Sequence, residues 1–546
     1  MTKWLIFAFT LVALCHPTYA QTINANSCSR SDVAAALAQV TQSTATVNIP
    51  AGHCQWSTNI NFAAPSGVTS LTVQGQTTCT GSGDPTQSNL ACTDGTVIQD
   101  NDTTDTQWLF NISGSGFVRI TGLTIEKGTG ATKNNAELAL SAGNNARIDH
   151  NHFNSYTGGS SSDLVSVGGC TYGVADHNLW TNTTGNTGFS ITPYNGEACN
   201  GATQSDGVWA LPTGFGGPNF FFIEQNVFNN GSTAGSTQAS DCLHGGKNVM
   251  RFNTLYNGAH FQTHPTGSSG PERGCRGTEI YQNNWIFTLG SGNLVNTIFF
   301  YSSGPALVWG NNAHQNGGMA GYASFVQLTD CRSPSGGSRC GYAEAPGGTG
   351  GWGYCGGSSP WDGNTNGTGY PCIDQPGRGE SDMLGGSFQN NNRVDMSTGT
   401  AKWPHQKLEP FYYWLNAYTP LANGNGSLTP IMLDGNIWTQ NQDYYVSSDQ
   451  NSGTDCNGFT GATGIGCGPR SSRPATCTTG VAWWSTDQGS WNQSGNASGN
   501  GVLDICTSAN SWTSASYTPY TYPHPLASNN GTPPPAAPTN LQVTVN

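Results

Sequence analysis

A short pattern of apolar and polar positions recurs along the chain, and each copy is centred on an asparagine. The copies are RIDHNHF, VADHNLW, FIEQNVF, VMRFNTL, EIYQNNW, LVWGNNA and MLDGNIW. An apolar residue stands three positions before each Asn and another, often aromatic, two positions after it. Two apolar columns on either side of a polar bend predict two strands that bury one face each. The central residues are Asn151, Asn178, Asn226, Asn253, Asn283, Asn311 and Asn436.

The spacing of these asparagines predicts a repeating coil. The steps between them are 27, 48, 27, 30, 28 and 125 residues. Steps of 27 to 30 fit one turn of a β-solenoid with a loop. The step of 48 predicts a long loop or an unrecognised coil, and the step of 125 predicts several hidden coils. Each Asn amide is expected to bond to the backbone and to its neighbours in a ladder.

These segments, with GGKNVMRFNTLYNGA and RGCRGTEIYQNNWIF, resemble the pectin-lyase-like right-handed parallel β-helix superfamily over about residues 28–440. The last two also resemble a block that recurs in secreted bacterial β-helix proteins without an established activity. The resemblance implies an all-β fold, a right-handed parallel β-helix. Its motifs specify the coil and leave the chemistry open.

The remaining segments predict what surrounds the solenoid. Ser31 and Asp32 precede an amphipathic run, which predicts an N-terminal capping helix. TATVNIPAGHCQW and SLTVQGQ are interpreted as the first strands. The expected division is a β-helix domain over 21–454 with a Gly/Cys-rich loop insertion at 329–382, a Cys- and aromatic-rich cap at 455–526, and a Pro-rich linker with a terminal strand at 527–546.

The N-terminus and the cysteines predict export. Lys3, an apolar run and the small-residue site at Ala20 are typical of a signal peptide over residues 1–20, cleaved after Ala20. Sixteen of the 17 Cys then remain, and an even number suits an extracellular, oxidising compartment. Mostly sequential pairs are expected: Cys28/Cys54, Cys79/Cys92, Cys170/Cys199, Cys242/Cys275, Cys331/Cys340, Cys355/Cys372, Cys456/Cys467 and Cys477/Cys506.

The overall charge narrows the classes of partner. Charged residues make up only 9% of the chain, and the net charge is -13. Nucleic-acid binding needs a basic field, so nucleic acid is excluded as a partner. After the N-terminal run no apolar stretch is long enough to insert into a membrane.

The position two residues before each Asn predicts an outward-facing column. If successive coils stack directly, three carboxylates lie in a row beside Arg251. Stacked like charges need a cation, raised pKa values or arginine partners. Pectate lyases are similar in placing carboxylates of successive coils around calcium, which implies a possible Ca²⁺ site at Asp149, Asp176 and Glu224. The alternative is a surface ladder neutralised by Arg147 and Arg251. The same column continues through Tyr281, Trp309 and Asp434.

The few cations of the chain concentrate between positions 244 and 276. Four of the 18 Lys and Arg and three of the 11 His, among them His244, stand there. A basic residue can take the C5 proton of a uronate while Arg binds its carboxylate. The catalytic candidates are Lys247, Arg251, His260, His264 and Arg276, and the substrate-binding candidates are Asp241, Arg273, Glu279 and Tyr281. Structural roles, such as Arg251 neutralising the acid column, remain the alternative for each residue.

Three function classes remain open. The first is a secreted polysaccharide lyase acting on an acidic glycan. The RxPxxR-like signature of classical pectate lyases is missing, and so are the motifs of polygalacturonases, which argues against a two-carboxylate hydrolase. The second is non-catalytic carbohydrate binding or adhesion, and the third is a structural protein that self-associates through the C-terminal strand LQVTVN. The second class would use exposed Trp352, Trp361, Trp483, Trp484 and Trp491.

Overall fold

The structure is a computed structural model of the whole chain. It describes residues 20–104, 108–114, 116–129, 137–142, 145–154, 162–181, 188–196, 199, 205–230, 238–257, 260–264, 273–288, 297–315, 324–329, 374–385, 394–395, 406–419, 429–434, 438–447, 456, 458–495 and 498–528. The predicted signal peptide, apart from Ala20, the disulfides Cys331/Cys340 and Cys355/Cys372, residues Trp352 and Trp361 and the strand LQVTVN lie outside the described residues.

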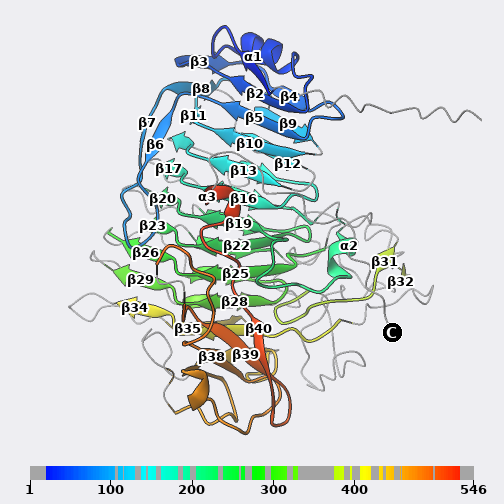
Figure 1. Cartoon of the computed structure of the whole chain (residues 1–546), viewed down its shortest axis with the longest axis vertical. Coiled ribbons are helices and arrows are strands. Elements are labelled where there is room, and N and C mark those ends of the chain that lie inside the picture. The colour runs from blue at the N-terminus through cyan, green and yellow to red at the C-terminus, as the bar shows by residue number, and fades with distance from the viewer. Residues whose placement is uncertain are drawn as a thin grey trace, which may run out of the picture.

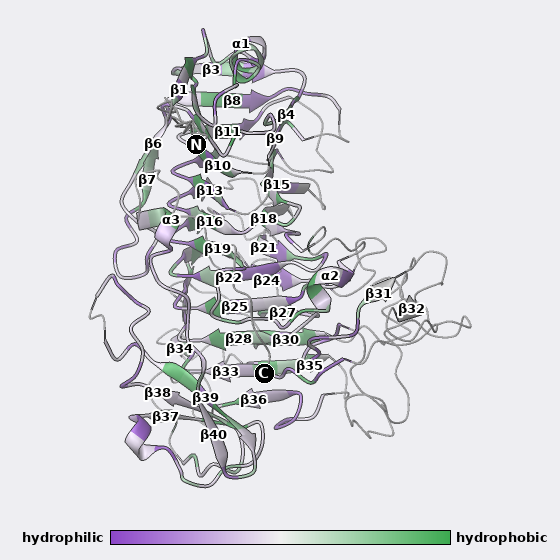
Figure 2. Cartoon of the chain, turned by 45° about the vertical axis from the view of Figure 1, so that its right-hand side comes forward, coloured by the Kyte–Doolittle hydropathy of each residue, from purple (hydrophilic) through white to green (hydrophobic). Residues whose placement is uncertain are grey.

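Three long sheets of parallel strands wind around one core, so the chain folds as a parallel β-helix (Figures 1 and 2). Sheet A runs through β1 (Gln21–Asn24), β2 (Thr44–Asn48), β5 (Ser70–Gln74), β10 (Phe117–Thr121), β13 (Ala146–Asp149), β16 (Gly173–Asp176), β19 (Phe221–Glu224), β22 (Lys247–Arg251), β25 (Gly277–Tyr281), β28 (Ala306–Trp309), β33 (Phe411–Trp414) and β36 (Tyr444–Val446). Sheet B runs through β3 (Gly52–Trp56), β8 (Thr96–Asp100), β11 (Thr124–Lys127), β14 (His152–Asn154), β17 (Leu179–Thr181), β20 (Val227–Asn229), β23 (Thr254–Tyr256), β26 (Asn284–Phe287), β29 (Asn312–Gln315) and β34 (Ala417–Thr419). Sheet C runs through β4 (Ile60–Ala63), β9 (Phe110–Gly114), β12 (Leu138–Ala142), β15 (Ser162–Val167), β18 (Gly188–Pro193), β21 (Gln238–Cys242), β24 (His260–Thr263), β27 (Thr297–Tyr301), β30 (Ser324–Thr329) and β35 (Thr429–Asp434).

The two apolar columns of the repeat form the core, as predicted. The first column lies in sheet A, the second lies in sheet B, and both are buried in one continuous cluster. Burying such side chains stabilises the fold by about 25 cal/mol per Å² of apolar surface. The first column contains Ile148, Ala175, Ile223, Met250, Ile280 and Val308, and the second contains Phe153, Trp180, Phe228, Leu255, Trp285 and Ala313.

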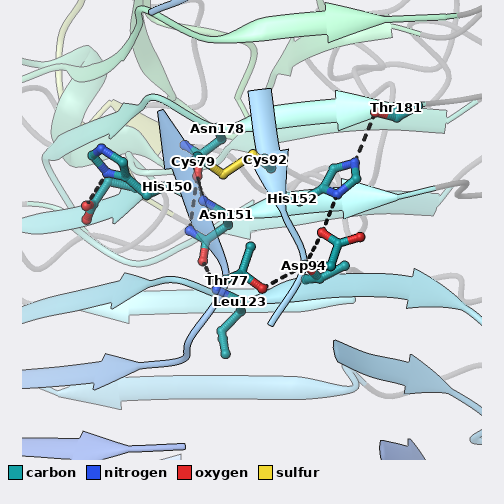
Figure 3. Close-up of a disulfide and its surroundings, with 12 residues drawn as sticks. Thr77, Cys79, Cys92, Asp94, Leu123, His150, Asn151, His152, Asn178 and Thr181 are labelled. Carbon is teal, nitrogen blue, oxygen red and sulfur yellow. Dashed lines mark hydrogen bonds and ion pairs between the residues drawn. A yellow bond between two sulfur atoms is a disulfide. The ribbon is translucent and has the colours of Figure 1, made fainter. Parts of the chain in front are cut away.

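The asparagines form the predicted ladder at the bend between sheets A and B. In each pair, the backbone N–H and the side-chain amide both donate to the Oδ1 of the next Asn, as Asn151 does to Asn178 at 3.0 Å (Figure 3). The residue before each Asn adopts a left-handed backbone, for example His150 with φ 54° and Phe252 with φ 53°. Such a conformation is strained for these residues, and the ladder offsets the strain at every coil.

The end of the repeat differs from the prediction. Asn311 bonds to Asn416, so Asn416 is the next rung of the ladder, and one long insertion accounts for most of the step. The segment MLDGNIW was wrongly predicted as a coil corner. Its Leu433 and Asp434 belong to β35 and pair with Leu328 and Thr329 in sheet C. Asp434 therefore does not continue the acid column of sheet A.

The N-terminal capping helix and the strands predicted after it are confirmed, but β1 precedes the helix and was not predicted. Helix α1 (Arg30–Leu37) begins at the N-cap Ser29, whose hydroxyl accepts from the Asp32 N–H at 3.3 Å. Ser31 and Asp32 therefore lie in the first turn and do not cap the helix. A hairpin of β6 (Thr78–Thr80) and β7 (Ala91–Thr93) lies against sheet B. The 48-residue step is a long loop that holds α2 (Asp206–Trp209), on the same side of the solenoid as β31 (Leu384–Gly385) and β32 (Val394–Asp395) (Figures 1 and 2).

The C-terminal part covers sheet A. A four-stranded sheet of β37 (Ile465–Gly468), β38 (Ala482–Ser485), β39 (Val502–Ser508) and β40 (Ser511–Tyr517) packs at the end of the solenoid, and a short helix η3 (Arg470–Ser472) lies between β37 and β38. Residues 517–528, here called the strap, then run back along sheet A and end in α3 (Pro525–Ser528) beside β16 (Figure 1). The strap is the feature that decides which outward residues of sheet A meet solvent.

Six disulfides link cysteines of the described chain, and all six are sequential pairs as predicted: Cys28–Cys54, Cys79–Cys92, Cys170–Cys199, Cys242–Cys275, Cys456–Cys467 and Cys477–Cys506. Within the described ranges, no helix is long and apolar enough to cross a bilayer.

Candidate functional site

The acid column of sheet A stacks as predicted. Asp149 pairs in register with Asp176, Asp176 with Glu224, and Glu224 with Arg251. All three carboxylates are completely buried. Burial favours their protonated forms, so the column depends on nearby donors to remain ionised.

Those donors are side chains and backbone of the chain itself. Arg119 binds Asp149 through two hydrogen bonds of 2.7 and 2.6 Å, and Arg147 binds Asp176 at 2.9 and 2.8 Å. Glu224 accepts from Arg251 at 2.7 Å and from the His524 N–H of the strap at 2.7 Å. The carboxylate oxygens already face cationic or N–H donors, so these residues do not fit a calcium site. Within the described part of the chain, no group of three or more His, Cys, Asp or Glu is arranged to hold a metal.

Arg251 and its neighbours lie under the strap. The Arg251 guanidinium donates to the Tyr281 hydroxyl at 2.9 Å and to the carbonyl oxygens of Tyr520 and Thr521 at 2.6 and 2.8 Å. Tyr281 is fully buried and stacks on Trp309. Through these contacts, Arg251 and Tyr281 hold the strap against the solenoid.

Glu279 lies beside them at the same interface. Its carboxylate accepts from the Tyr517 hydroxyl at 2.6 Å and from the Gly216 N–H at 2.8 Å. Burial raises the pKa of Glu279, and these two donors partly oppose that rise. Glu279 thus joins the start of the strap to the loop that follows α2.

Arg273 and Arg276 tie loops together. Arg273 binds Asp374 at 2.7 and 2.6 Å and Asp206 at 3.2 Å, and it lies over the Trp209 ring. Arg276, over the same ring, donates to the Leu211 carbonyl oxygen at 2.8 Å. Both guanidinium groups are buried.

Lys247 has a different environment. Its Nζ lies 4.4 Å from the centre of the Phe220 ring and makes no ion pair or hydrogen bond with any described residue. Burial, together with the charge of the nearby Arg276, lowers the pKa of Lys247 to about 7. Lys247 Nζ lies close to Gly214, which lines a cavity of about 680 Å³ together with Phe215, Tyr412 and Tyr517.

A separate cluster of titratable groups lies on sheet C, on four successive strands. Asp163 stands on β15, Tyr194 directly follows β18, Asp241 stands on β21, and His264 directly follows β24. Parallel neighbouring strands lie about 4.8 Å apart, so one side chain from each coil converges on the same wall. We call these four residues the acid–base cluster.

The Asp241–His264 pair has the geometry of an oriented base. His264 Nδ1 lies 2.9 Å from Asp241 Oδ2. A carboxylate only accepts hydrogen bonds, so Nδ1 carries the proton and Nε2 keeps its lone pair in the neutral ring. Nε2 faces the Gln262 amide. The Cys242–Cys275 disulfide holds the pair, since Cys242 donates to Asp241 and accepts from the His264 N–H, each at 2.8 Å.

The Asp163–Tyr194 pair supplies an acid. The Tyr194 hydroxyl donates to Asp163 Oδ2 at 2.6 Å. Burial, together with the charge of Asp241 and against the effect of its hydrogen bonds, raises the pKa of Asp163 to about 7. Burial also raises the pKa of Tyr194 well above its usual range, so the phenol keeps its proton. Asp163 thus exchanges its proton near neutral pH beside an oriented imidazole.

The structure therefore divides the predicted site residues. It brings Asp241 and His264 together in the acid–base cluster, with His244 near Tyr194 at a ring distance of 5.6 Å. It places the remaining candidates elsewhere. Lys247, Arg273 and Arg276 are buried against loops, and Arg251, Tyr281 and Glu279 lie under the strap. His260 is buried at the start of β24, opposite Gln238. Sequence reasoning missed Asp163 and Tyr194, because the strands of sheet C carry no marker like the Asn of the bend.

The aromatic residues of the C-terminal part are packed inside it. Trp483, Trp484 and Trp491 are at most 6% exposed. Trp484 and Trp491 pack against Trp309 of the solenoid. The prediction that these three residues present exposed sugar-stacking faces is wrong, because Trp484 and Trp491 lie in the interface with sheet A and Trp483 packs on Phe459.

The sheets, the ladder and the strap define a parallel β-helix with an acid–base cluster on one wall. No protein-family model matches the chain, and no curated protein matches it. Among solved structures, an alginate lyase from Paenibacillus sp. str. FPU-7 matches with a TM-score of 0.32 and 14% identity, over 56% of this chain and 99% of that one. A match this distant carries no argument about residues or activity.

Proposed function

We propose that the chain is an exported polysaccharide-active enzyme, a lyase that cleaves an acidic, uronate-containing glycan at the acid–base cluster. The observation that carries the proposal is the oriented Asp241–His264 pair beside an acid whose pKa is about 7. The six disulfides support export to an oxidising compartment.

The chemistry follows from the two pairs. In β-elimination the C5–H bond breaks, a C4–C5 double bond forms, and the C4–O bond to the leaving sugar breaks. His264 Nε2 is the group that takes the C5 proton, and the charge of Asp241 stabilises the imidazolium that results. Protonated Asp163 delivers a proton to the leaving oxygen, while Tyr194 holds its carboxyl in place. The Gln262 amide, which contacts His264 Nε2, has to leave that nitrogen when the substrate binds.

The test is a screen of uronate polymers for the ultraviolet absorbance of the new C4–C5 double bond. We expect His264→Gln to lower kcat/KM by about 10²–10⁴-fold, because general base catalysis contributes that much. The matched control is His314→Gln, which changes a partly exposed His on β29 of sheet B. Turnover by the parent chain that persists unchanged in His264→Gln would exclude this site.

The protonation of Asp163 is expected to set the alkaline limit of activity. The acid must be protonated to act, and its pKa in the folded chain is about 7. Activity is therefore present below pH 7 and should fall by about tenfold per pH unit above it. A pH profile of kcat/KM measures this limb, and Asp163→Asn should remove it along with most of the rate. An Asp163→Asn variant that keeps the parent profile would assign the proton to another group.

Glycan binding without turnover is the second candidate, and the 680 Å³ cavity favours it. Aromatic rings of Phe215, Tyr412 and Tyr517 line this cavity together with the Glu409 carboxylate. Aromatic walls with a few polar groups are typical of ligand sites. Retention of intact glycans on an array would support binding here if Tyr412→Ala loses that retention and His264→Gln keeps it. Self-association through LQVTVN stays a prediction.

A further inference from the structure

Three side chains on the outer side of sheet B form a second hydrogen-bonded series, distinct from the acid–base cluster. His152 begins β14, Thr181 ends β17 on the next coil, and Asp94 follows the hairpin strand β7. His152 Nδ1 lies 2.7 Å from Asp94 Oδ1, and His152 Nε2 lies 3.1 Å from Thr181 Oγ1 (Figure 3). The imidazole thus stands between a carboxylate and a hydroxyl.

The direction of the hydrogen bonds follows from the chemistry of the groups. Asp94 Oδ1 also accepts from the Thr124 hydroxyl at 2.7 Å, and Thr124 contacts Thr77 at 2.9 Å. The Asp94 carboxylate accepts only, so Nδ1 of neutral His152 carries the proton. Nε2 is then the acceptor, and the Thr181 hydroxyl donates to it. This is the order of nucleophile, base and orienting carboxylate that activates a hydroxyl.

The fold holds the series rigid and leaves its end accessible. The Cys79–Cys92 disulfide closes the hairpin two residues before Asp94. Thr77, just before the other strand of the hairpin, bonds to the Gly95 N–H at 3.0 Å and so fixes the turn that carries Asp94. The side chain of His152 is 11% exposed and that of Asp94 is 34% exposed. Thr181 is partly exposed as well.

We propose that Asp94, His152 and Thr181 form an acyl-transfer site that hydrolyses small acyl esters. Thr181 Oγ attacks the ester carbonyl carbon while His152 Nε2 takes its proton. The C–O bond of the ester breaks, and the leaving alcohol takes that proton from the imidazolium. Water, deprotonated by His152, then cleaves the acyl-threonine, which releases the acid and restores the hydroxyl. The overall reaction consumes one water per ester.

The residue types indicate the substrate class. The threonine hydroxyl is secondary and carries a methyl group beside it, so a short acyl group such as acetyl fits the attack better than a long chain. An ester is favoured over an amide, because an alcohol leaves more readily than an amine. The site lies on sheet B and the acid–base cluster on sheet C, so this activity does not depend on the proposed lyase activity.

The test uses p-nitrophenyl acetate with the full oxidised chain. We expect a burst of p-nitrophenol, an intact mass increased by one acetyl group, and peptide mapping that places the acetyl group on Thr181. Thr181→Val should lose the adduct and at least about 10²-fold of the hydrolysis rate, and His152→Gln and Asp94→Asn should also lose rate. Thr181→Ser should retain both adduct and turnover, which shows that a loss in Thr181→Val is not a folding defect.

Matched controls come from the same face. Thr419→Val changes the outward threonine that ends β34, and His314→Gln changes a His of β29, and neither should alter the burst. The lyase variant His264→Gln should also retain it. The proposal is overturned if no acetyl-enzyme forms, if the acetyl group maps to a lysine or any residue other than Thr181, or if Thr181→Val hydrolyses the ester at the parent rate.

Discussion

Replacing Arg251 with methionine is expected to lower the free energy of unfolding by about 3–5 kcal/mol, because it leaves the Glu224 carboxylate buried without its cation. Both side chains are fully buried. The substitution also removes the donors that hold the carbonyl oxygens of Tyr520 and Thr521. The strap should therefore become accessible to protease under conditions in which the parent chain resists cleavage.

Denaturant unfolding of three variants separates the causes. Lys407→Met removes an ion pair that is 66% exposed on the lysine side, and its cost should stay below about 1 kcal/mol. Arg251→Met with Glu224→Leu removes both buried charges and should recover part of the loss. If Arg251→Met costs no more than Lys407→Met, the buried pair does not hold the strap.

Replacing Asn253 with leucine is expected to cost about 3–5 kcal/mol, because several buried backbone and amide groups then lack partners at about 1–3 kcal/mol each. The Asn253 amide donates to the Ile223 carbonyl oxygen at 2.8 Å and to Asn283 at 2.9 Å, and its oxygen accepts from the Asn226 N–H at 3.0 Å. The ladder also offsets the left-handed backbone of Phe252. A central break should therefore affect coils on both sides.

The matched control is Asn312→Leu, an exposed asparagine at the start of β29. It should change the unfolding free energy by less than about 0.5 kcal/mol. Amide hydrogen exchange in the coils next to Asn253 should accelerate in the ladder variant alone. Equal costs for the two substitutions would mean that the ladder adds no stability beyond that of any asparagine.

The coil could be predicted because one local feature repeats. The Asn amide, its left-handed neighbour and the two apolar columns occur within seven residues, so a single corner of sheets A and B can be recognised without knowledge of the rest. The same local rule misassigned MLDGNIW, whose composition imitates a corner although Leu433 pairs in sheet C. It also missed Asn416, where the aromatic Tyr413 and Tyr418 replace the usual pattern.

The candidate site was harder to predict, because exposure depends on distant parts of the chain. The outward parity of Arg251 was correct, but the strap that covers it lies about 270 residues further along. Asp241 and His264 were chosen from a basic segment, and their pairing rests on the Cys242–Cys275 disulfide. Asp163 and Tyr194 join them only through the stacking of sheet C, which no local sequence feature indicates.

The strap determines when the outer face of sheet A is completed during synthesis. Glu224 and Arg251 are made early, but their last partners, His524 and Thr521, come from the end of the described chain. Until those residues have been made, the outer face of the middle coils of sheet A remains exposed to solvent, and its charged side chains have only some of their partners. Closure also includes the loop between β6 and β7, which lies beside the middle coils, since Tyr522 donates to Asp84 at 2.5 Å and the neighbouring Gly83 N–H donates to the Gln225 carbonyl oxygen at 3.0 Å. The outer face of the middle coils of sheet A is therefore closed only after residues 517–528 have been made.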